Sequence, residues 1–264
     1  MFQKKTPLQK EWDSMRKQEI RFLKNKAKQK ESILNRQLAD KVPDKLQMTL
    51  DTAFEKAFSL IFEKGTGIID KTYPKEKVRE NYQINEFADS LKQSRKTVHS
   101  FVKTAQGSGT RNLVLSGVAG IGMGLVGVGI PDIPLLTAMM LKSVYEIAVS
   151  YGYEYDTETE KGFILMLIQG AVSCGKTMTQ IDEQINAFIM EEKLPNDFEL
   201  NVQIRQTANL LSKELLYMKF LQGIPVVGAV GGAYDVIYMK HIIEYANIKY
   251  LRRFLMNKKH IFQK

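Results

Sequence analysis

Apolar residues recur at intervals of three and four along most of this chain, which is the spacing of one face of an α-helix. A core-facing helix over residues 44–62 is predicted by its apolar residues Leu46, Leu50, Ala53, Phe54, Ala57, Phe58 and Ile61. The same spacing predicts helices over residues 8–41, 85–105, 179–193 and 198–221, with the polar region through residues 74–82 as a connector. Residues 163–172 are continuously apolar except for Gln169, and their Leu and Met content favours a buried helix over a strand. Because no stretch alternates between apolar and polar residues, we predict an all-α multi-helix bundle.

Two glycine-rich apolar units interrupt this pattern. Residues 113–131 carry no charge, and six of these nineteen residues are glycine, although a glycine inside a helix costs ~1 kcal/mol relative to alanine. Four of the glycines would line one helix face that allows another backbone to approach closely: Gly117, Gly120, Gly124 and Gly127. A shorter unit near the end, with Pro225, Gly228 and Gly232, repeats the small-residue spacing. The two units resemble a loose internal pair, with proline and glycines in reversed order.

The first glycine-rich unit is compatible with three arrangements. A buried helix pair in a soluble bundle is the favoured one, a shallow or hairpin insertion into a membrane is the second, and a single spanning helix is the third. Nineteen residues would just span a bilayer. However, Pro131, Asp132 and Pro134 interrupt the continuation of the apolar run.

The residues after Pro131 predict an amphipathic helix with defined ends. Asp132 is a suitable N-cap, and Pro134 is tolerated in the first turn. The apolar stripe consists of Leu136, Met140, Val144, Ile147 and Tyr151. Lys142 and Glu146 are four residues apart on the other side, where they are expected to pair, and Gly152 is expected to close the helix as its C-cap.

Turn residues divide the chain into three segments. Residues 1–42 form a basic amphipathic N-terminal arm that ends before Pro43, residues 43–106 form a helical region, and residues 107–264 form the glycine-rich helical core. The Gly107-Ser108-Gly109 sequence is the clearest internal boundary.

The net charge of +9 is concentrated at the two ends of the chain. Residues 1–41 hold twelve Lys and Arg against five Asp and Glu, and residues 249–264 hold six Lys and Arg and no acid. Such ends attract a polyanion, either nucleic acid or an anionic lipid surface. Nucleic acid is the less favoured partner because no recognisable reading motif is present. The oligomeric state is not predicted.

Two interpretations of the N-terminal arm remain open. In the favoured one, it packs a few apolar residues on the body of the protein. In the other, it is an amphipathic segment that lies in a lipid interface. The candidates for membrane contact are Trp12, Phe22, Arg252, Arg253, Lys258 and Lys259.

The single cysteine, Cys174, excludes an internal disulfide and fits a reducing compartment. The first residues are basic but lack the apolar segment of a secretory signal. We therefore expect a cytoplasmic protein, peripheral or shallowly inserted at the inner face of the membrane.

Residues 170–177 fit the phosphate-loop pattern G-x-x-x-x-G-K-[ST], with Gly175, Lys176 and Thr177 at its end. A phosphate loop also requires a preceding strand and an aspartate on a second strand, and the flanking segments read as helices. We favour a junction between two helices with Gly175 as C-cap, and keep nucleotide binding as the alternative function. The histidines His99, His241 and His260 are far apart, and no catalytic set, metal site or cofactor is predicted.

Two blocks of sequence together resemble the EcsC protein family. The first runs from Gly129 through Pro131, Asp132 and Pro134 to the Tyr151-Gly152-Tyr153 sequence, and the second is residues 224–233. The resemblance implies a helical, membrane-associated protein without an established activity, from a family named after a bacterial operon that also encodes an ABC transporter. We therefore expect a non-enzymatic protein at the cytoplasmic face, with a membrane or transporter partner.

Overall fold

The computed structural model describes residues 5–28, 44–63, 69, 73–107, 133–222 and 231–262. Every regular element in these ranges is a helix, and none is a strand, which confirms the all-α prediction. The labelled helices are α1 (Pro7–Lys28), α3 (Asp44–Glu63), α5 (Lys75–Leu91), α7 (Ile133–Ser150), α8 (Glu158–Val172), α9 (Gly175–Glu191), α10 (Leu200–Gln222) and α11 (Gly231–Phe262). One more helix covers residues 95–107.

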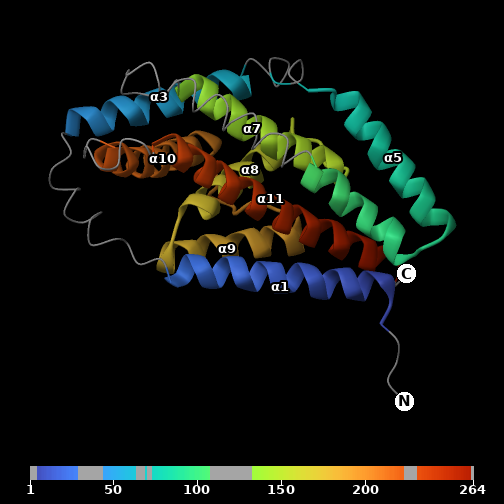
Figure 1. Ribbon diagram of the computed structural model, residues 1–264. Coiled ribbons are helices and arrows are strands. Elements are labelled where there is room, and N and C mark those ends of the chain that lie inside the picture. The colour runs from blue at the N-terminus through green and yellow to red at the C-terminus, as the bar shows by residue number, and fades with distance from the viewer. Residues whose placement is uncertain are drawn as a thin grey trace.

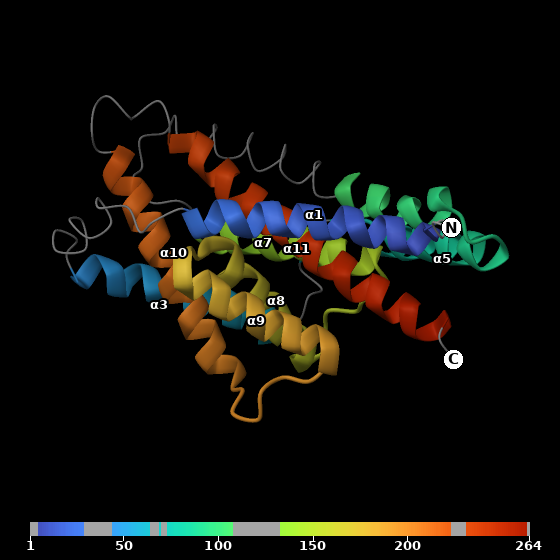
Figure 2. The same cartoon turned by 90° about the horizontal axis from the view of Figure 1, so that it is seen from below.

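The helices form three layers with an appended hairpin (Figure 1). Helices α3 and α7 pack together on one side, and α1 and α9 pack together on the other. Helices α8, α10 and α11 lie between these pairs, with α8 contacting both α10 and α11. Helix α5 packs on α7 and forms a hairpin with residues 95–107 at one end of the bundle, as the view from below also shows (Figure 2). Residues from all three sequence segments contribute to one hydrophobic core.

The position of α8 in the middle layer explains why its sequence is so apolar. Helix α8 is covered on both sides, and its residues from Gly162 to Val172 are all buried. A helix that is apolar on every side is expected in such a position. The prediction of a buried helix over residues 163–172 is therefore confirmed.

Local side-chain bonds explain two helix starts. Thr6 and Gln9 bond reciprocally through side chain and backbone, which caps α1, and Pro7 takes the first helical position. Ser94 and Thr97 make the same reciprocal bonds at the start of the helix over residues 95–107. The prediction of one helix over residues 85–105 is therefore wrong. Residues 74–82, expected as a connector, lie mostly in α5, which begins at Lys75.

Helix α7 confirms the predicted C-terminal cap and the predicted pairing of Lys142 with Glu146, but not the expected place of that pair. Pro134 lies in the first turn. At the other end, Gly152 has a φ of +84° and donates to Val149, while Tyr153 donates to Ala148, which is the Schellman pattern of a helix C-terminus. Glu146, however, is buried rather than on a solvated side, and its carboxylate lies 4.0 Å from Lys142. The reason is that α7 is covered by α3, α5 and α11 instead of by one neighbour.

Much of the two glycine-rich units lies outside the described residues. This holds for Gly117, Gly120, Gly124, Gly127, Pro131, Asp132, Pro225 and Gly228. Gly232 lies in the first turn of α11. The close-packing and membrane alternatives for residues 113–131 therefore remain predictions.

Candidate functional site

Helix α11 carries positive charge into the centre of the bundle. Lys249 is completely buried, and Arg253 and Lys258 are nearly so. A buried cation is tolerated only where acceptors surround it. Here the acceptors come from α1, α5, α8 and α9, so α11 is joined by charge to four other helices.

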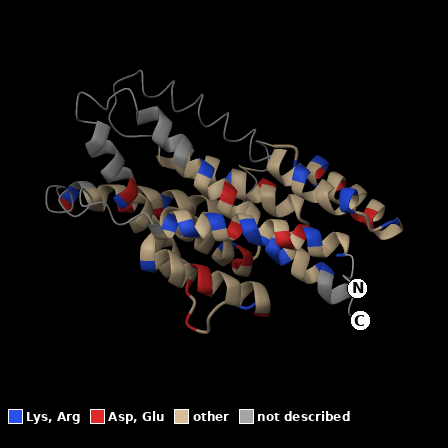
Figure 3. Cartoon of the chain, turned by 60° about the horizontal axis from the view of Figure 1, so that its bottom comes forward, with Lys and Arg blue, Asp and Glu red and all other residues tan. Residues whose placement is uncertain are grey.

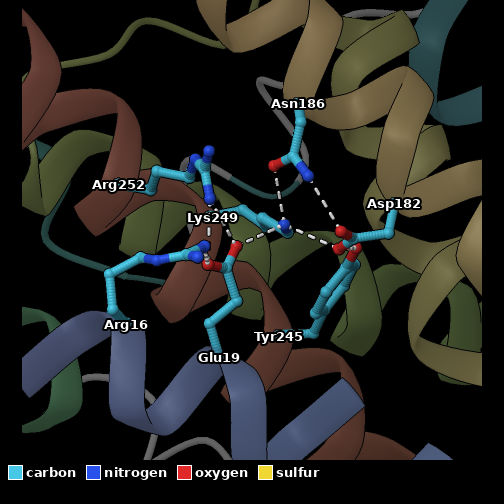
Figure 4. Close-up of polar contacts among 7 residues, drawn as sticks. All are labelled: Arg16, Glu19, Asp182, Asn186, Tyr245, Lys249 and Arg252. Atoms are coloured by element: carbon cyan, nitrogen blue, oxygen red, sulfur yellow. Dashed lines mark hydrogen bonds and ion pairs between the residues drawn. The ribbon is translucent and has the colours of Figure 1, made fainter. Parts of the chain in front are cut away.

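The most buried of these contacts form the Lys249 cluster, which comprises Arg16, Glu19, Asp182, Asn186, Tyr245, Lys249 and Arg252 (Figure 4). Lys249 Nζ lies 2.6 Å from a Glu19 oxygen and 2.6 Å from an Asp182 oxygen. It also donates to Asn186 Oδ1 at 2.9 Å. The ammonium therefore has three protein acceptors, which is its full donor capacity.

Each carboxylate of the cluster has further donors. Arg252 bonds both oxygens of Glu19, at 3.1 and 2.9 Å, and Arg16 donates to Glu19 at 2.7 Å. Tyr245 and Asn186 donate to Asp182 at 2.6 and 2.8 Å. The cluster thus holds α1, α9 and α11 together through bonds that leave no carboxylate oxygen unpaired.

The electrostatics of the cluster favour the charged form of Glu19. Burial alone raises the pKa of its carboxyl, but the charge and hydrogen bond of Lys249, with Arg252 and Arg16, outweigh burial and lower that pKa. Burial, and then the neighbouring Asp182, raises the pKa of Tyr245 well above its ordinary value. Tyr245 therefore stays a neutral hydrogen-bond donor to Asp182.

Two other cations of α11, Arg253 and Lys258, extend this arrangement along the helix. Arg253 bonds both oxygens of Glu160 at 3.0 and 2.8 Å, and Tyr250 donates to the same carboxylate at 2.7 Å. Lys258 bonds Glu86 at 2.7 Å and Asp89 at 3.1 Å, which ties the C-terminal half of α11 to α5.

These contacts correct several of the predicted membrane contacts. Phe22 is buried and stacks on Tyr245, while Arg253 and Lys258 are buried in ion pairs, so none of the three presents its side chain to a surface. Trp12 is partly buried beneath the guanidinium of Arg252, 5.8 Å from the ring centre. The side chain of Lys259 lies outside the described residues. The sequence pattern could not predict these contacts, because it does not show which helices pack against α11.

The outer face of α1 carries exposed cations, in contrast to the buried cations of α11. We call this surface the α1 basic face. It consists of the exposed residues Lys10, Lys17, Arg21 and Lys24, whose spacings of seven, four and three place them along one line of the helix. The acids Glu11 and Glu19 face inward and are buried. Figure 3 shows blue Lys and Arg along this helix. Folding has sorted most charges of α1, with these four cations outside and Glu11 and Glu19 inside, while Lys26 is buried against His241.

Two of the histidines have described side chains, and each has a charged neighbour. His99 Nδ1 lies 3.2 Å from Glu11. His241 Nδ1 lies 3.2 Å from the ammonium of Lys26, and burial, with Lys26 and Lys240, lowers the pKa of His241 to about 4. In the described part of the chain, no three His, Cys, Asp or Glu side chains gather as a metal site.

The predicted phosphate loop lies at a junction between two helices. The residues that would form its strand lie in α8, and Gly170 is inside that helix, where a Cβ would meet Tyr245 at 2.7 Å. Only Ser173 and Cys174 separate α8 from α9, and Lys176 and Thr177 lie exposed in the first turn of α9. Ser173, not Gly175, is the C-cap of α8, while Gly175 begins α9 with a φ of +57°. The strand–loop–helix geometry of a phosphate loop is therefore not formed here.

Among the described helices, α7 alone is long and apolar enough to cross a membrane, with a mean hydropathy of 1.3 over its 18 residues. However, 67% of this stretch is buried inside the protein. Burial of that kind is typical of a core helix, so α7 is weak evidence for a membrane span.

Comparison with known proteins gives a family but no individual relative. No curated protein and no solved structure matches the chain. The model of the EcsC protein family matches residues 9–255, which include α1, the Lys249 cluster and most of α11. This match covers nearly the whole chain and agrees with the two sequence blocks that resemble the family, so the protein belongs to the EcsC protein family.

Proposed function

We propose that this protein is a non-enzymatic, peripheral membrane protein that docks on an anionic bilayer surface through the α1 basic face. The observation that carries the proposal is the sorting of charge on α1. Lys10, Lys17, Arg21 and Lys24 are all exposed, whereas Glu11 and Glu19 are withdrawn into internal contacts. The remaining acid of the helix, Asp13, is paired with Lys5.

The packing of α1 supports a rigid docking surface. Met15 and Phe22 are buried on its inner side, and the Lys249 cluster anchors Glu19. The four cations therefore hold their spacing without an ordering step when they meet a surface. A basic residue near an anionic leaflet contributes about 1 kcal/mol, or roughly a fivefold increase in binding. The four together are sufficient for reversible attachment.

We place this surface at the cytoplasmic face, because anionic lipid there attracts basic segments. The protein partner suggested by the family resemblance is a membrane transporter. Attachment through α1 leaves the opposite layer, α3 and α7, turned away from the membrane.

The proposal is tested by co-sedimentation of the full chain with phosphatidylcholine vesicles that contain or lack phosphatidylglycerol. We expect binding only to the anionic vesicles, with release as NaCl is raised from 0.1 to about 0.5 M. The triple variant Lys17→Gln, Arg21→Gln, Lys24→Gln should bind at least tenfold more weakly.

A matched control carries the same change of net charge elsewhere. Lys45→Gln, Lys56→Gln and Lys213→Gln alter exposed residues of α3 and α10. This variant should bind as the unmodified chain does. Equal loss of binding in both variants would show that net charge, and not the α1 basic face, drives attachment. A chain that stays in the supernatant at low salt would refute the proposal.

A further inference from the structure

An exposed apolar stripe lies on α5, away from the core. Ile84, Phe87 and Leu91 are 64%, 66% and 71% exposed. Their spacings of three and four place all three on one line of the helix. The buried residues of α5, Val78 and Asp89, lie on the opposite side. We call these three residues the α5 triad. The other exposed large apolar side chains of the described residues are isolated on different helices or at different faces.

The residues that follow the triad add positive charge, and no ion pair joins their cations to another described residue. Lys92, Arg95, Lys96 and Lys103 are all exposed on the turn and the returning helix. Between Phe87 and Gly107 the only acid is Asp89, which is buried and bonded to Thr97 and Lys258. From Phe87 onward the hairpin tip therefore presents apolar groups and cations together, and the nearest preceding carboxylate, Glu86, is partly exposed and bonded to Lys258.

Internal contacts hold this hairpin in place. Lys258 joins α5 to α11, and the Ser94–Thr97 bonds fix the turn. His99, on the returning helix, meets Glu11 of α1. The hairpin tip and the first turns of α1 thus lie at the same end of the bundle, as Figure 2 shows.

We propose that the α5 triad inserts into the interfacial region of an anionic bilayer while Lys92, Arg95 and Lys96 contact its headgroups. This inference rests on the proposed membrane attachment and adds a second, apolar element to it. A lipid surface is the occupant that fits, because it offers negative charge in one plane and hydrocarbon directly beneath. A soluble acidic ligand would leave three large apolar side chains in water.

Insertion is tested with a fluorescent probe whose emission depends on polarity. Cys174 is first replaced by serine in the full chain, and a nitrobenzoxadiazole label is then attached at Leu91→Cys or, as a control, at Met48→Cys. Met48 is 67% exposed, close to the 71% of Leu91, but lies on α3, in the layer opposite α1. With phosphatidylglycerol vesicles, we expect a blue shift and higher emission at position 91 and no change at position 48.

The contribution to binding is measured with the triple variant Ile84→Ser, Phe87→Ser, Leu91→Ser. Its vesicle binding should fall at least tenfold, since each apolar side chain removed from water favours the bound state. The control Met48→Ser, Leu60→Ser also removes exposed apolar residues, which are 67% and 42% exposed and lie on α3, and it should bind normally. Circular dichroism should show unchanged helix content in both, because these side chains lie outside the core.

The outcomes separate this inference from the proposed function. If the unmodified chain binds anionic vesicles, but the probe at position 91 does not respond and the triad variant binds equally well, insertion is overturned and docking through α1 stands. If the unmodified chain does not bind, both proposals fail. Vesicle-independent dimerisation that is lost in the triad variant would assign the triad to self-association instead of lipid.

Discussion

At the scale of single residues, three glycines at helix ends differ in what an added side chain would do. It would strain the backbone and meet a ring at one, strain the backbone alone at another, and do neither at the third. Gly152 has a φ of +84°, and a Cβ there would meet the Tyr82 ring at 2.4 Å. Gly175 has a φ of +57° with open space around it, and Gly107 has open space and no positive φ. A side chain in the left-handed region costs roughly 1–2 kcal/mol.

Alanine at these three positions should therefore give a graded series. Gly107→Ala should leave the free energy of unfolding unchanged or slightly raised, because alanine favours a helix. Gly175→Ala should lower it by about 1 kcal/mol through strain alone. Gly152→Ala should lower it further, because Tyr82 must also move. Urea denaturation measures all three, and equal effects at Gly175 and Gly152 would show that the ring moves without cost.

At the scale of elements, the bundle is cross-braced by α11. Its cations reach α1 and α9 through Lys249, α8 through Arg253 and α5 through Lys258. Such buried pairs are weak sources of net stability but are costly to break on one side, because a buried charge is left without its partner. They therefore fix which helices meet and at which register.

Removing Lys249, the central cation, should show how costly it is to take away one partner of a buried ion pair. We expect Lys249→Met to lower the free energy of unfolding by about 3–5 kcal/mol, since Glu19 and Asp182 then remain buried without it. Arg16→Met removes a half-exposed partner of the same carboxylate and should cost less than about 1 kcal/mol. Adding Glu19→Gln to Lys249→Met should recover part of the loss in urea denaturation. If Lys249→Met were no more harmful than Arg16→Met, the cluster would have no bracing role.

At the scale of the whole molecule, the half-buried His241 and the buried Glu19 make folding sensitive to acid. The pKa of His241 falls from 6.5 to about 4 through burial and the charges of Lys26 and Lys240. Below pH 6.5 the unfolded chain takes up a proton at His241 that the folded chain refuses, so stability falls as the pH falls toward 4. The lowered pKa of Glu19 acts in the same direction at lower pH, because its carboxylate stabilises the fold only while ionised.

We therefore expect the free energy of unfolding to be highest above pH 6.5 and to fall by roughly 2 kcal/mol by pH 4.5, once partial solvation of the ring is allowed for. Urea denaturation at pH 7.5, 5.5 and 4.5 measures this change. His241→Asn, which can still accept a bond from Lys26 but cannot take up a proton, should lose less stability over the same range. Parallel pH profiles for the two proteins would rule out His241 as the source.

The sequence by itself determined the features that depend on near neighbours along the chain. Helical periodicity predicted an all-α bundle, and Gly152 was identified as a C-cap because the Schellman pattern involves only adjacent turns. The helix break at residues 92–94 was missed, although the Ser94 and Thr97 spacing that causes it is also local. The sequence blocks were sufficient to identify the EcsC family.

Only the tertiary structure decided which charges turn inward. Lys249 and Glu19 are 230 residues apart in the chain, and no local pattern shows that they meet. The position of Glu19, in line with Met15 and Phe22, was a visible hint of an internal partner. Lys249, Arg253 and Lys258 of the basic C-terminal segment, predicted as surface charge, form the internal brace, and the α1 basic face keeps its charge exposed. The physical reason is that burial of an ion depends on partners from other helices, whereas helix formation depends on the helix itself.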